Sequence, residues 1–297
     1  MQAPPEIPGV THRYVEARGL RFHYAEAGAP DGDPILLLHG WPQHHYEWRH
    51  HLTALADTNR VIALDLRGYG WSDAPRHGYD KENFATDVLA VLDALNLDQV
   101  KLIGHDWGGW TGFLMCIREP DRFSHFLALA ITHPWQSIGR GWRQLPRFWY
   151  QLVILTPLLG YALHRSHGFI RAALKHGTND ETFTRAELDS FADNLAEPAR
   201  SRACVQTYRT FVLREQIPLI TGRYADTRLR TPTHLMLGDR DPVLKPALLA
   251  GYEAHADAMT TEIVPNCGHF IADEYPDLVT QRARELFARE AAPVTVT

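Results

Sequence analysis

The chain has 297 residues, of which 45% are hydrophobic and 22% are charged, and its formal net charge is -5. This length and composition predict a folded protein with one large core, or a core with an insertion, and argue against disorder. The balance of charges supplies no broad basic surface, so we expect no nucleic-acid partner. Three cysteines do not make a disulfide framework, which favours a reducing compartment.

The beginning of the chain and its longest apolar stretch bear on location. The first ten residues are rich in proline and lack the basic region and apolar stretch of a secretory signal. The apolar stretch 152–163 is shorter than the roughly 20 residues that a membrane-spanning helix needs, and it contains Pro157 and Gly160. We therefore expect a cytoplasmic protein without a membrane span.

Short apolar runs in the first part of the chain each stop at a polar residue or at glycine. Residues 13–27 alternate between apolar and polar, as in a hairpin of two strands. The runs 35–38, 61–64 and 100–103 are continuous, which is typical of strands buried on both faces of a parallel sheet. Residues 83–95 carry apolar side chains at helical spacing. This alternation of strand and helix predicts a doubly wound, mostly parallel α/β sheet.

The alternation fails in the middle of the chain and then resumes. The later strands and the closing helix are expected at 126–131, 233–237, 261–264 and 277–289. About 100 residues between the first two of these strands show helical spacing and no clear buried strand. We therefore expect an α/β core formed by residues 1–133 and 228–297, with residues 134–227 inserted as a helical lid.

The strongest local signal is the sequence Leu-Ile-Gly-His-Asp-Trp-Gly-Gly at 102–109, which predicts a strand, a sharp turn and a helix. In the pattern Gly-x-nucleophile-x-Gly, the nucleophile lies in a strained turn where larger neighbours would collide with the adjacent strand and helix. Asp106 holds the central position, and His105 is interpreted as structural support for the turn. An aspartate here could also be a simple helix N-cap, but the motifs that follow favour a nucleophile.

A second motif, Leu-His-Gly-Trp-Pro at 38–42, directly follows a predicted buried strand. A backbone N–H at this position, together with the N–H of the residue after the nucleophile, can form an oxyanion hole. The expected donors are the backbone N–H groups of Trp41 and Trp107. A simple turn at His39-Gly40 is the structural alternative.

An acid and a histidine follow the last two predicted strands. Asp241 comes just after the strand 233–237, and His269 comes just after the strand 261–264. Carboxyl ends of parallel strands share one edge of a sheet, so both residues can approach Asp106 there. The order nucleophile, acid, histidine is that of α/β-hydrolases. Asp239 competes for the acid role, but the Pro-Val that follows Asp241 favours Asp241.

Taken together, these motifs resemble the soluble epoxide hydrolases of the α/β-hydrolase family. The segment Asp-Leu-Arg-Gly-Tyr-Gly-Trp-Ser-Asp at 65–73 resembles that family's segment after the fourth strand. Residues 104–109 match its nucleophile turn, including the tryptophan after the aspartate. The resemblance covers essentially the whole chain. It implies hydrolysis of an epoxide to a vicinal diol through an ester on Asp106, without cofactor or metal.

The resemblance also implies that two tyrosines in the lid supply the acid for ring opening. Tyr150, in Phe-Trp-Tyr-Gln-Leu, resembles the first of them, and Tyr208, in Thr-Tyr-Arg-Thr, resembles the second. A tyrosine hydroxyl, with an ordinary pKa of about 10, can donate to the epoxide oxygen while it remains neutral. The alternative is that each tyrosine is an ordinary packed aromatic. Tyr161 and Tyr224 are reserve candidates.

Two other functions stay open. A haloalkane dehalogenase would use the same Asp-His-Asp triad but would need N–H donors for the halide. Dehalogenases of this resemblance usually have asparagine in place of Trp41, and fluoroacetate dehalogenases usually have arginine in place of Trp107, so both positions count against this function. Other indoles that could hold a halide are those of Trp135, Trp142 and Trp149. A non-catalytic binding protein of this fold would tend to lose a catalytic residue, and none is missing.

Four histidines, at positions 44, 45, 50 and 51, invite a metal hypothesis. Adjacent histidines on a helix point in different directions, and no neighbouring cysteine or carboxylate completes a ligand set. We expect these side chains on a solvated helix surface or at the mouth of a cavity, and no metal site. The partners expected are a small-molecule epoxide and water, with a homodimer left open.

Overall fold

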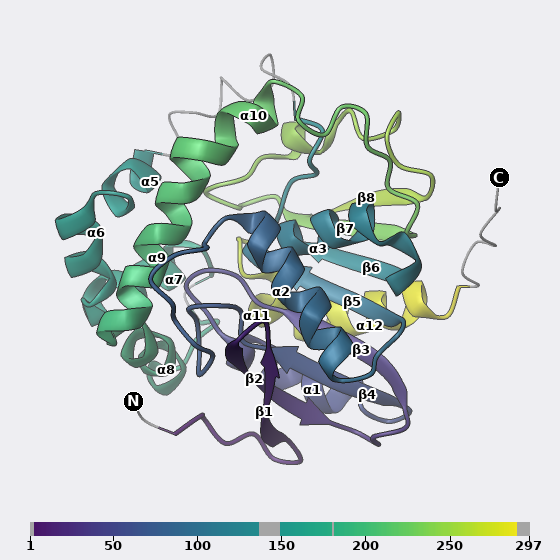
Figure 1. The fold of residues 1–297 in the computed structure, drawn as a ribbon, viewed down its shortest axis with the longest axis horizontal. Helices are drawn as coiled ribbons and strands as arrows, with labels where there is room; N and C mark the ends of the chain where they lie inside the picture. Colours follow the sequence, from purple (N-terminus) through teal and green to yellow (C-terminus); the bar gives the residue numbers. More distant parts are fainter. Residues whose placement is uncertain (1–2, 137–148, 180, 290–297) are drawn as a thin grey trace.

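The computed structural model describes residues 3–136, 149–179 and 181–289, with the side chains of residues 149 and 150 excepted. Its centre is an eight-stranded sheet in the order β1-β2-β4-β3-β5-β6-β7-β8 (Figure 1). The first two strands form an antiparallel hairpin whose second strand pairs antiparallel with β4, and all the other pairings are parallel. The strands are β1 (Thr11–Ala17), β2 (Leu20–Ala27), β3 (Asp33–Leu38), β4 (Asn59–Leu64), β5 (Val100–His105), β6 (Phe123–Leu129), β7 (Thr233–Gly238) and β8 (Met259–Val264). The predicted doubly wound α/β sheet is confirmed.

Helices cover both faces of the sheet because the central strands are apolar on both sides. In β3, Leu36 and Leu38 belong to one core cluster, while Ile35 and Leu37 belong to the other. The first cluster packs against α2 (Lys81–Ala94) and α3 (Trp107–Arg118), and the second packs against α1 (Arg49–Ala54) and α12 (Pro276–Phe287). A short helix, α11 (Ile271–Glu274), precedes α12. The continuous apolar runs in the sequence therefore correspond to strands buried on both faces.

The parallel strands end together at one edge of the sheet. Leu38 at the end of β3 is paired with Gly104 of β5, and His105 at the end of β5 is paired with Leu129 of β6. Gly238, at the end of β7, is paired with the last residue of β8. The loops that carry the candidate catalytic residues all leave the sheet from this edge, which is where α/β sheets place their sites.

The residues between β6 and β7 form helices on one side of the sheet and, among those described, no strand. Figure 1 shows these helices, in teal and green, grouped beside the sheet edge. They are α5 (Trp149–Ile154), α6 (Pro157–His164), α7 (His167–His176), α8 (Arg185–Ala196), α9 (Pro198–Thr210), a π-helical turn η4 (Phe211–Glu215) and α10 (Gln216–Ile220). None of the described helices is long and apolar enough to cross a membrane.

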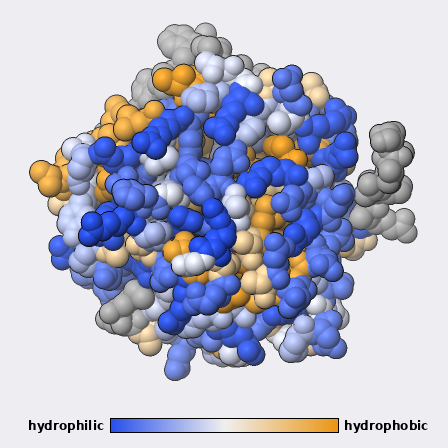
Figure 2. Space-filling view, viewed as in Figure 1, coloured by the Kyte–Doolittle hydropathy of each residue, from blue (hydrophilic) through white to orange (hydrophobic). Residues whose placement is uncertain are grey.

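The outer surface of this helical segment is partly apolar. Leu152, Leu158 and Leu159 have exposed fractions of 60%, 85% and 49%. Figure 2 shows apolar surface at the position of α5 and α6, on a face that is otherwise mostly hydrophilic. Dimer formation through such a surface stays a prediction.

Candidate active site

Asp106 lies in a sharp turn between β5 and α3, in a backbone conformation that few non-glycine residues adopt. Its φ is 47° and its ψ is -116°, and such strain is characteristic of functional positions. Close packing requires the neighbouring glycines: a Cβ on Gly40 would lie 2.4 Å from the Asp106 Cβ, and a Cβ on Gly108 would lie 2.1 Å from the Leu38 carbonyl oxygen. The sequence motif therefore forms the strained turn that it predicts.

The Asp106 carboxylate faces the loop after β3. The backbone N–H of Trp41 donates to Asp106 Oδ2 at 2.9 Å. Trp107 begins α3, where backbone N–H groups have no acceptor within the helix. Of the two expected oxyanion donors, the Trp41 N–H thus contacts the carboxylate from the loop after β3, and Trp107 follows Asp106 at the N-terminus of α3.

The structure brings Asp241 and His269 together. His269 Nδ1 lies 2.8 Å from Asp241 Oδ2, and the other oxygen of Asp241 accepts from the backbone N–H groups of Val243 and Leu244. Burial alone would raise the pKa of Asp241, but His269 and these N–H groups hold it below its usual value. The side chain of Asp239, the competing candidate, is exposed. Only Asp241, of the two acids, is therefore placed to orient the histidine.

The second nitrogen of His269 points toward Asp106 without bonding to it. His269 Nε2 and Asp106 Oδ1 are 4.0 Å apart, which exceeds hydrogen-bond distance. The separation places the imidazole beside the carboxylate rather than against it, so that a small molecule such as water can approach both groups.

His105, interpreted above as support for the turn, connects three loops of the site. Its Nδ1 pairs with Glu47 Oε1 at 2.9 Å, and its Nε2 donates to the backbone oxygen of His269 at 3.0 Å. Glu47 also accepts from the backbone N–H of Gly40 at 3.2 Å. Burial would lower the pKa of His105, but Glu47 outweighs it and raises that pKa to about 9. A cationic His105 therefore links the nucleophile turn, the histidine loop and the loop after β3.

The helical segment brings Tyr208 to the same place. Tyr208 is 2% exposed and lies on α9, with its ring edge-on to Trp41 at 5.5 Å and to Trp107 at 5.6 Å between centroids. Tyr150 lies in the first turn of α5, and its side chain is outside the described residues. Of the reserve candidates, Tyr224 donates its hydroxyl to Glu82 at 2.9 Å, and Tyr161 packs under an arginine of its own helix.

The indole N–H groups of the candidate tryptophans differ in their hydrogen-bond partners. Trp41 donates its Nε1–H to His164 Nε2 at 3.0 Å, and Trp135 donates to Thr227 at 3.1 Å. Within the described residues, Trp107 Nε1 has no hydrogen-bond partner. Trp142 and the side chain of Trp149 lie outside the residues that the structure describes. The contact between Trp41 and His164 could not be predicted from local sequence patterns, because it joins residues far apart in the chain.

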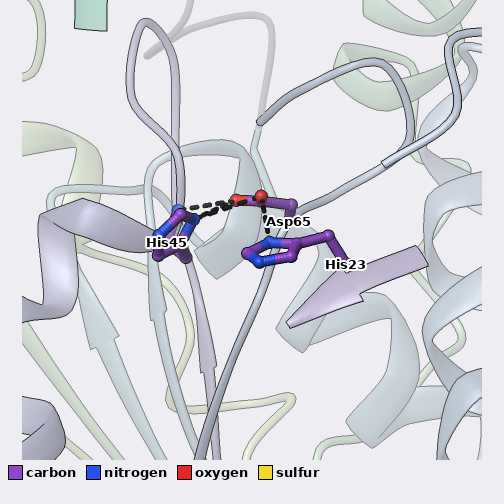
Figure 3. A group of neighbouring side chains, drawn as sticks. All are labelled: His23, His45 and Asp65. Atoms are coloured by element: carbon purple, nitrogen blue, oxygen red, sulfur yellow. Dashed lines mark hydrogen bonds and ion pairs between the residues drawn. The ribbon is translucent and has the colours of Figure 1, made fainter. Parts of the chain in front are cut away.

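The expectation for the histidines was wrong for three of the four. His44, His45 and His51 are buried, and only His50 is exposed. His45 meets His23 of β2 and Asp65 after β4, and ligand atoms of these three side chains lie within 4.8 Å of one another (Figure 3). The carboxylate of this cluster comes from the end of another strand, β4, and not from the local sequence.

In this buried cluster of His23, His45 and Asp65, both carboxylate oxygens of Asp65 accept hydrogen bonds, while His45 Nε2 has no partner among the described residues. Asp65 accepts from the His23 and His45 rings at 2.7 and 3.1 Å, and from the backbone N–H groups of His45 and Trp71 at 2.7 and 2.9 Å. A cation would have to displace donors of this set, and the backbone donors cannot turn away. We therefore interpret the cluster as a hydrogen-bonding centre that fixes the loop after β3.

Comparisons with known proteins agree with this architecture. Residues 33–276 match the family model described as alpha/beta hydrolase fold. The soluble epoxide hydrolase of Corynebacterium sp. (strain C12) is 30% identical over 94% of this chain and 98% of its own length. Epoxide hydrolase 4 of Mus musculus is 30% identical over 91% of this chain and 77% of its own length. A solved structure, epoxide hydrolase CorEH without ligand, has a TM-score of 0.76 at 29% identity and covers 94% of this chain and 99% of that one. The chain therefore belongs to the α/β-hydrolase fold family and, within it, to the epoxide hydrolases, as its motifs implied.

Proposed function

We propose that the protein hydrolyses an epoxide to a vicinal diol through a covalent ester on Asp106. The observation that carries this proposal is the juxtaposition at the nucleophile turn: a carboxylate that accepts the N–H of Trp41 at 2.9 Å, with His269 Nε2 4.0 Å away. A carboxylate nucleophile attacks an alkyl carbon, because its own carbonyl then becomes the group that water cleaves. The relatives named as epoxide hydrolases support the substrate class.

In the first step, an oxygen of Asp106 attacks one epoxide carbon and the ring C–O bond breaks. The leaving oxygen is a strong base and needs a proton, which Tyr208 and Tyr150 supply. Tyr208 is suited to this role because its ring lies between the indoles of Trp41 and Trp107, the residues beside the carboxylate. The products of this step are an alkyl ester on Asp106 and a tyrosinate.

In the second step, His269 takes a proton from water, and the resulting hydroxide attacks the ester carbonyl carbon of Asp106. Asp241 orients His269 and stabilises the imidazolium. The backbone N–H groups of Trp41 and Trp107 stabilise the tetrahedral oxyanion. Its collapse releases the diol and restores the Asp106 carboxylate, and the proton held by His269 returns to the tyrosinate. The 4.0 Å separation favours action on water rather than directly on Asp106.

Residues 134–227 form the lid in this proposal, and residues 1–133 and 228–297 form the core. The support is that the described part of this range is helical and carries Tyr208 to the sheet edge. The substrate is bound between the two parts, and no cofactor takes part in the reaction.

One contact bears on the choice between an epoxide and an alkyl halide. Halide ions in a dehalogenase are held by N–H donors, and an indole beside the nucleophile is a natural donor. Here the indole N–H of Trp41 is donated to His164, so of the two indoles beside the nucleophile only that of Trp107, which has no hydrogen-bond partner among the described residues, is left to hold a halide. Together with Tyr208 at the nucleophile, this contact favours an oxygen leaving group that needs a proton.

The test is a product assay with styrene oxide beside a bromoalkane of similar size. We expect the diol from styrene oxide and no bromide release. Bromide release without diol would contradict the proposal and favour dehalogenation. The Asp106→Ala variant, assayed in parallel, should form neither product, which assigns any turnover to this site.

A further inference from the structure

Lys81 is a buried lysine between the sheet side of the site and the helical segment. It begins α2 and is 1% exposed, although lysine is almost never fully buried unless it is paired. Its ammonium donates to the backbone oxygens of Tyr79 at 3.3 Å and Thr207 at 3.2 Å, and it pairs with Glu215 at 3.6 Å. The buried ammonium is thus held by two hydrogen bonds and one ion pair.

Two of these acceptors belong to the helix that carries Tyr208. Thr207 directly precedes Tyr208 on α9, and Glu215 ends the π-helical turn η4 that continues this helix. Glu215 also accepts the backbone N–H of Lys81 at 3.0 Å. Burial lowers the pKa of Lys81 and raises that of Glu215, and each charge opposes the shift of the other. A π-helical turn at this point is consistent with a functional demand on local geometry.

The same ammonium contacts the nucleophile side. Lys81 Nζ lies 4.5 Å from the centroid of the Trp107 ring, within the range of a cation–π interaction. Trp107 follows Asp106 directly, and its ring meets the ring of Tyr208 at 5.6 Å. One side chain therefore contacts the residue after the nucleophile and the residue before the tyrosine.

We propose that Lys81 is a positioning residue, which holds Tyr208 in register with Asp106 by fastening the α9–η4 helix to the N-terminus of α2 and to Trp107. This inference rests on the proposed function, since it requires Tyr208 to donate the proton in ring opening. Displacing a reacting group by about 1 Å can cost a factor of about 100 in rate. Lys81 should therefore affect ester formation, which uses Tyr208, and leave ester hydrolysis, which uses His269, nearly unchanged.

The experiment measures ester formation alone, in the His269→Gln background, by intact mass after rapid quenching with styrene oxide. Lys81→Met keeps the length of the side chain and its packing against the aromatic rings but removes the charge. We expect it to slow ester formation about 10- to 100-fold. Tyr208→Phe should also slow it, and the combination of Lys81→Met with Tyr208→Phe should be no slower than the slower of the two single variants.

The matched control is Lys101→Met. Lys101 lies at the opposite end of β5 from Asp106 and also contacts a carboxylate and an aromatic ring, those of Asp33 and Phe287. Its removal should leave the rate of ester formation within about twofold. Lys81→Arg, which keeps a charge and donors, should recover part of the lost rate.

Three results would overturn the inference: ester formation at the parental rate in Lys81→Met, multiplicative effects in the combined variant, or, in the wild-type background, equal slowing of ester formation and ester hydrolysis by Lys81→Met. Where Lys81→Met does not fold, Glu215→Gln replaces it, because this change removes only the ion pair. The rate of ester formation in Glu215→Gln combined with Tyr208→Phe is then compared with the rates in the two single variants, and multiplicative effects would again overturn the inference. Absence of any adduct in the His269→Gln parent would instead contradict the proposed function itself.

Discussion

Asp106, Asp241 and His269 are carried by loops at the ends of sheet strands, whereas Tyr208 is carried by a helix that packs mainly against other helices of its own segment. The register of the paired strands, such as β5 with β6 and β7 with β8, fixes the positions of Asp106, Asp241 and His269 relative to one another. No such register links α9 to the sheet. Its position near Asp106 depends on side-chain contacts between the two parts.

Several described contacts of this kind join the helical segment to the sheet part. Lys81 of α2 donates to the Thr207 carbonyl group, Trp41 donates to His164 of α6, and Arg49 of α1 pairs with Glu187 of α8 at 2.7 Å. Changes on the sheet side should therefore remove a chemical step, while changes on the helix side should misalign one. The predictions below test that difference.

The largest effect is expected from Asp241→Asn. Loss of the carboxylate leaves His269 without its orienting partner, and in serine proteases with a Ser-His-Asp triad the corresponding change lowers kcat by about 10⁴-fold. The exposed Asp239 supplies the control, since Asp239→Asn should leave kcat within about twofold. Steady-state diol formation measures both. Comparable losses in the two variants would remove Asp241 from its assigned role.

The next effect tests the helix side directly. Tyr150→Phe combined with Tyr208→Phe removes the proposed acids, and general acid catalysis contributes about 10²- to 10⁴-fold. Single-turnover measurements should show slow ester formation and an unchanged rate of ester hydrolysis. Normal ester formation in this double variant would contradict the assignment of the acid pair, and slowing of hydrolysis alone would place the tyrosines in the second step.

His164 allows a finer test. Its Nδ1 donates to the Gly160 carbonyl oxygen at 2.7 Å, so its Nε2 is free to accept from Trp41. Burial lowers the pKa of His164 to about 4, which keeps the ring neutral at pH 7. His164→Gln retains an acceptor at this position, whereas His164→Phe leaves the buried indole N–H unpaired, at a cost of about 1–3 kcal/mol.

We expect His164→Phe to lower the melting temperature and to reduce kcat about tenfold, by loosening Trp41 beside Asp106. His164→Gln should stay within about threefold of the wild type. His176, exposed near the end of α7, provides a control substitution to Phe in the same segment. Equal effects of the Gln and Phe substitutions at position 164 would show that its acceptor is unimportant.

The last expected effect concerns the sheet side and is a change in stability at alkaline pH. The pKa of His105 is raised to about 9 in the folded protein, mainly by Glu47 against the opposing effect of burial. A raised pKa stabilises the fold fully below the unfolded pKa of about 6.5, and this stabilisation, on the order of 3 kcal/mol, is lost as the pH rises through about 9. Melting temperatures from pH 6 to 10 should therefore fall more steeply for the wild type than for His105→Gln. Parallel profiles would contradict this account.

The sequence allowed the convergence of the three triad candidates at one edge of the sheet to be predicted, whereas their catalytic roles stay a proposal. Asp106, Asp241 and His269 follow apolar runs whose parallel pairing brings their ends to one edge, so that local patterns were sufficient. The connections to the helical segment could not be predicted in this way. Lys81 and His164 have no motif around them, and their partners lie 126 and 123 positions away in the chain.

The error over the histidines has the same cause. His45 was expected at a solvated surface or a cavity mouth because no nearby cysteine or carboxylate completes a ligand set, yet Asp65 and His23 reach it from the end of β4 and from β2. Periodicity shows which residues are buried in regular elements, but it says little about loops. The burial of a polar loop residue depends on which other strand ends meet it.

The most direct test of the two-step mechanism is the His269→Gln variant mixed with styrene oxide and followed by intact mass. Ester formation needs Asp106 and the tyrosines, whereas ester hydrolysis needs His269. The account predicts that the protein gains the mass of one epoxide molecule and keeps it, and that peptide mapping locates the adduct on Asp106. Release of diol at the wild-type rate, or an adduct on any other residue, would contradict it.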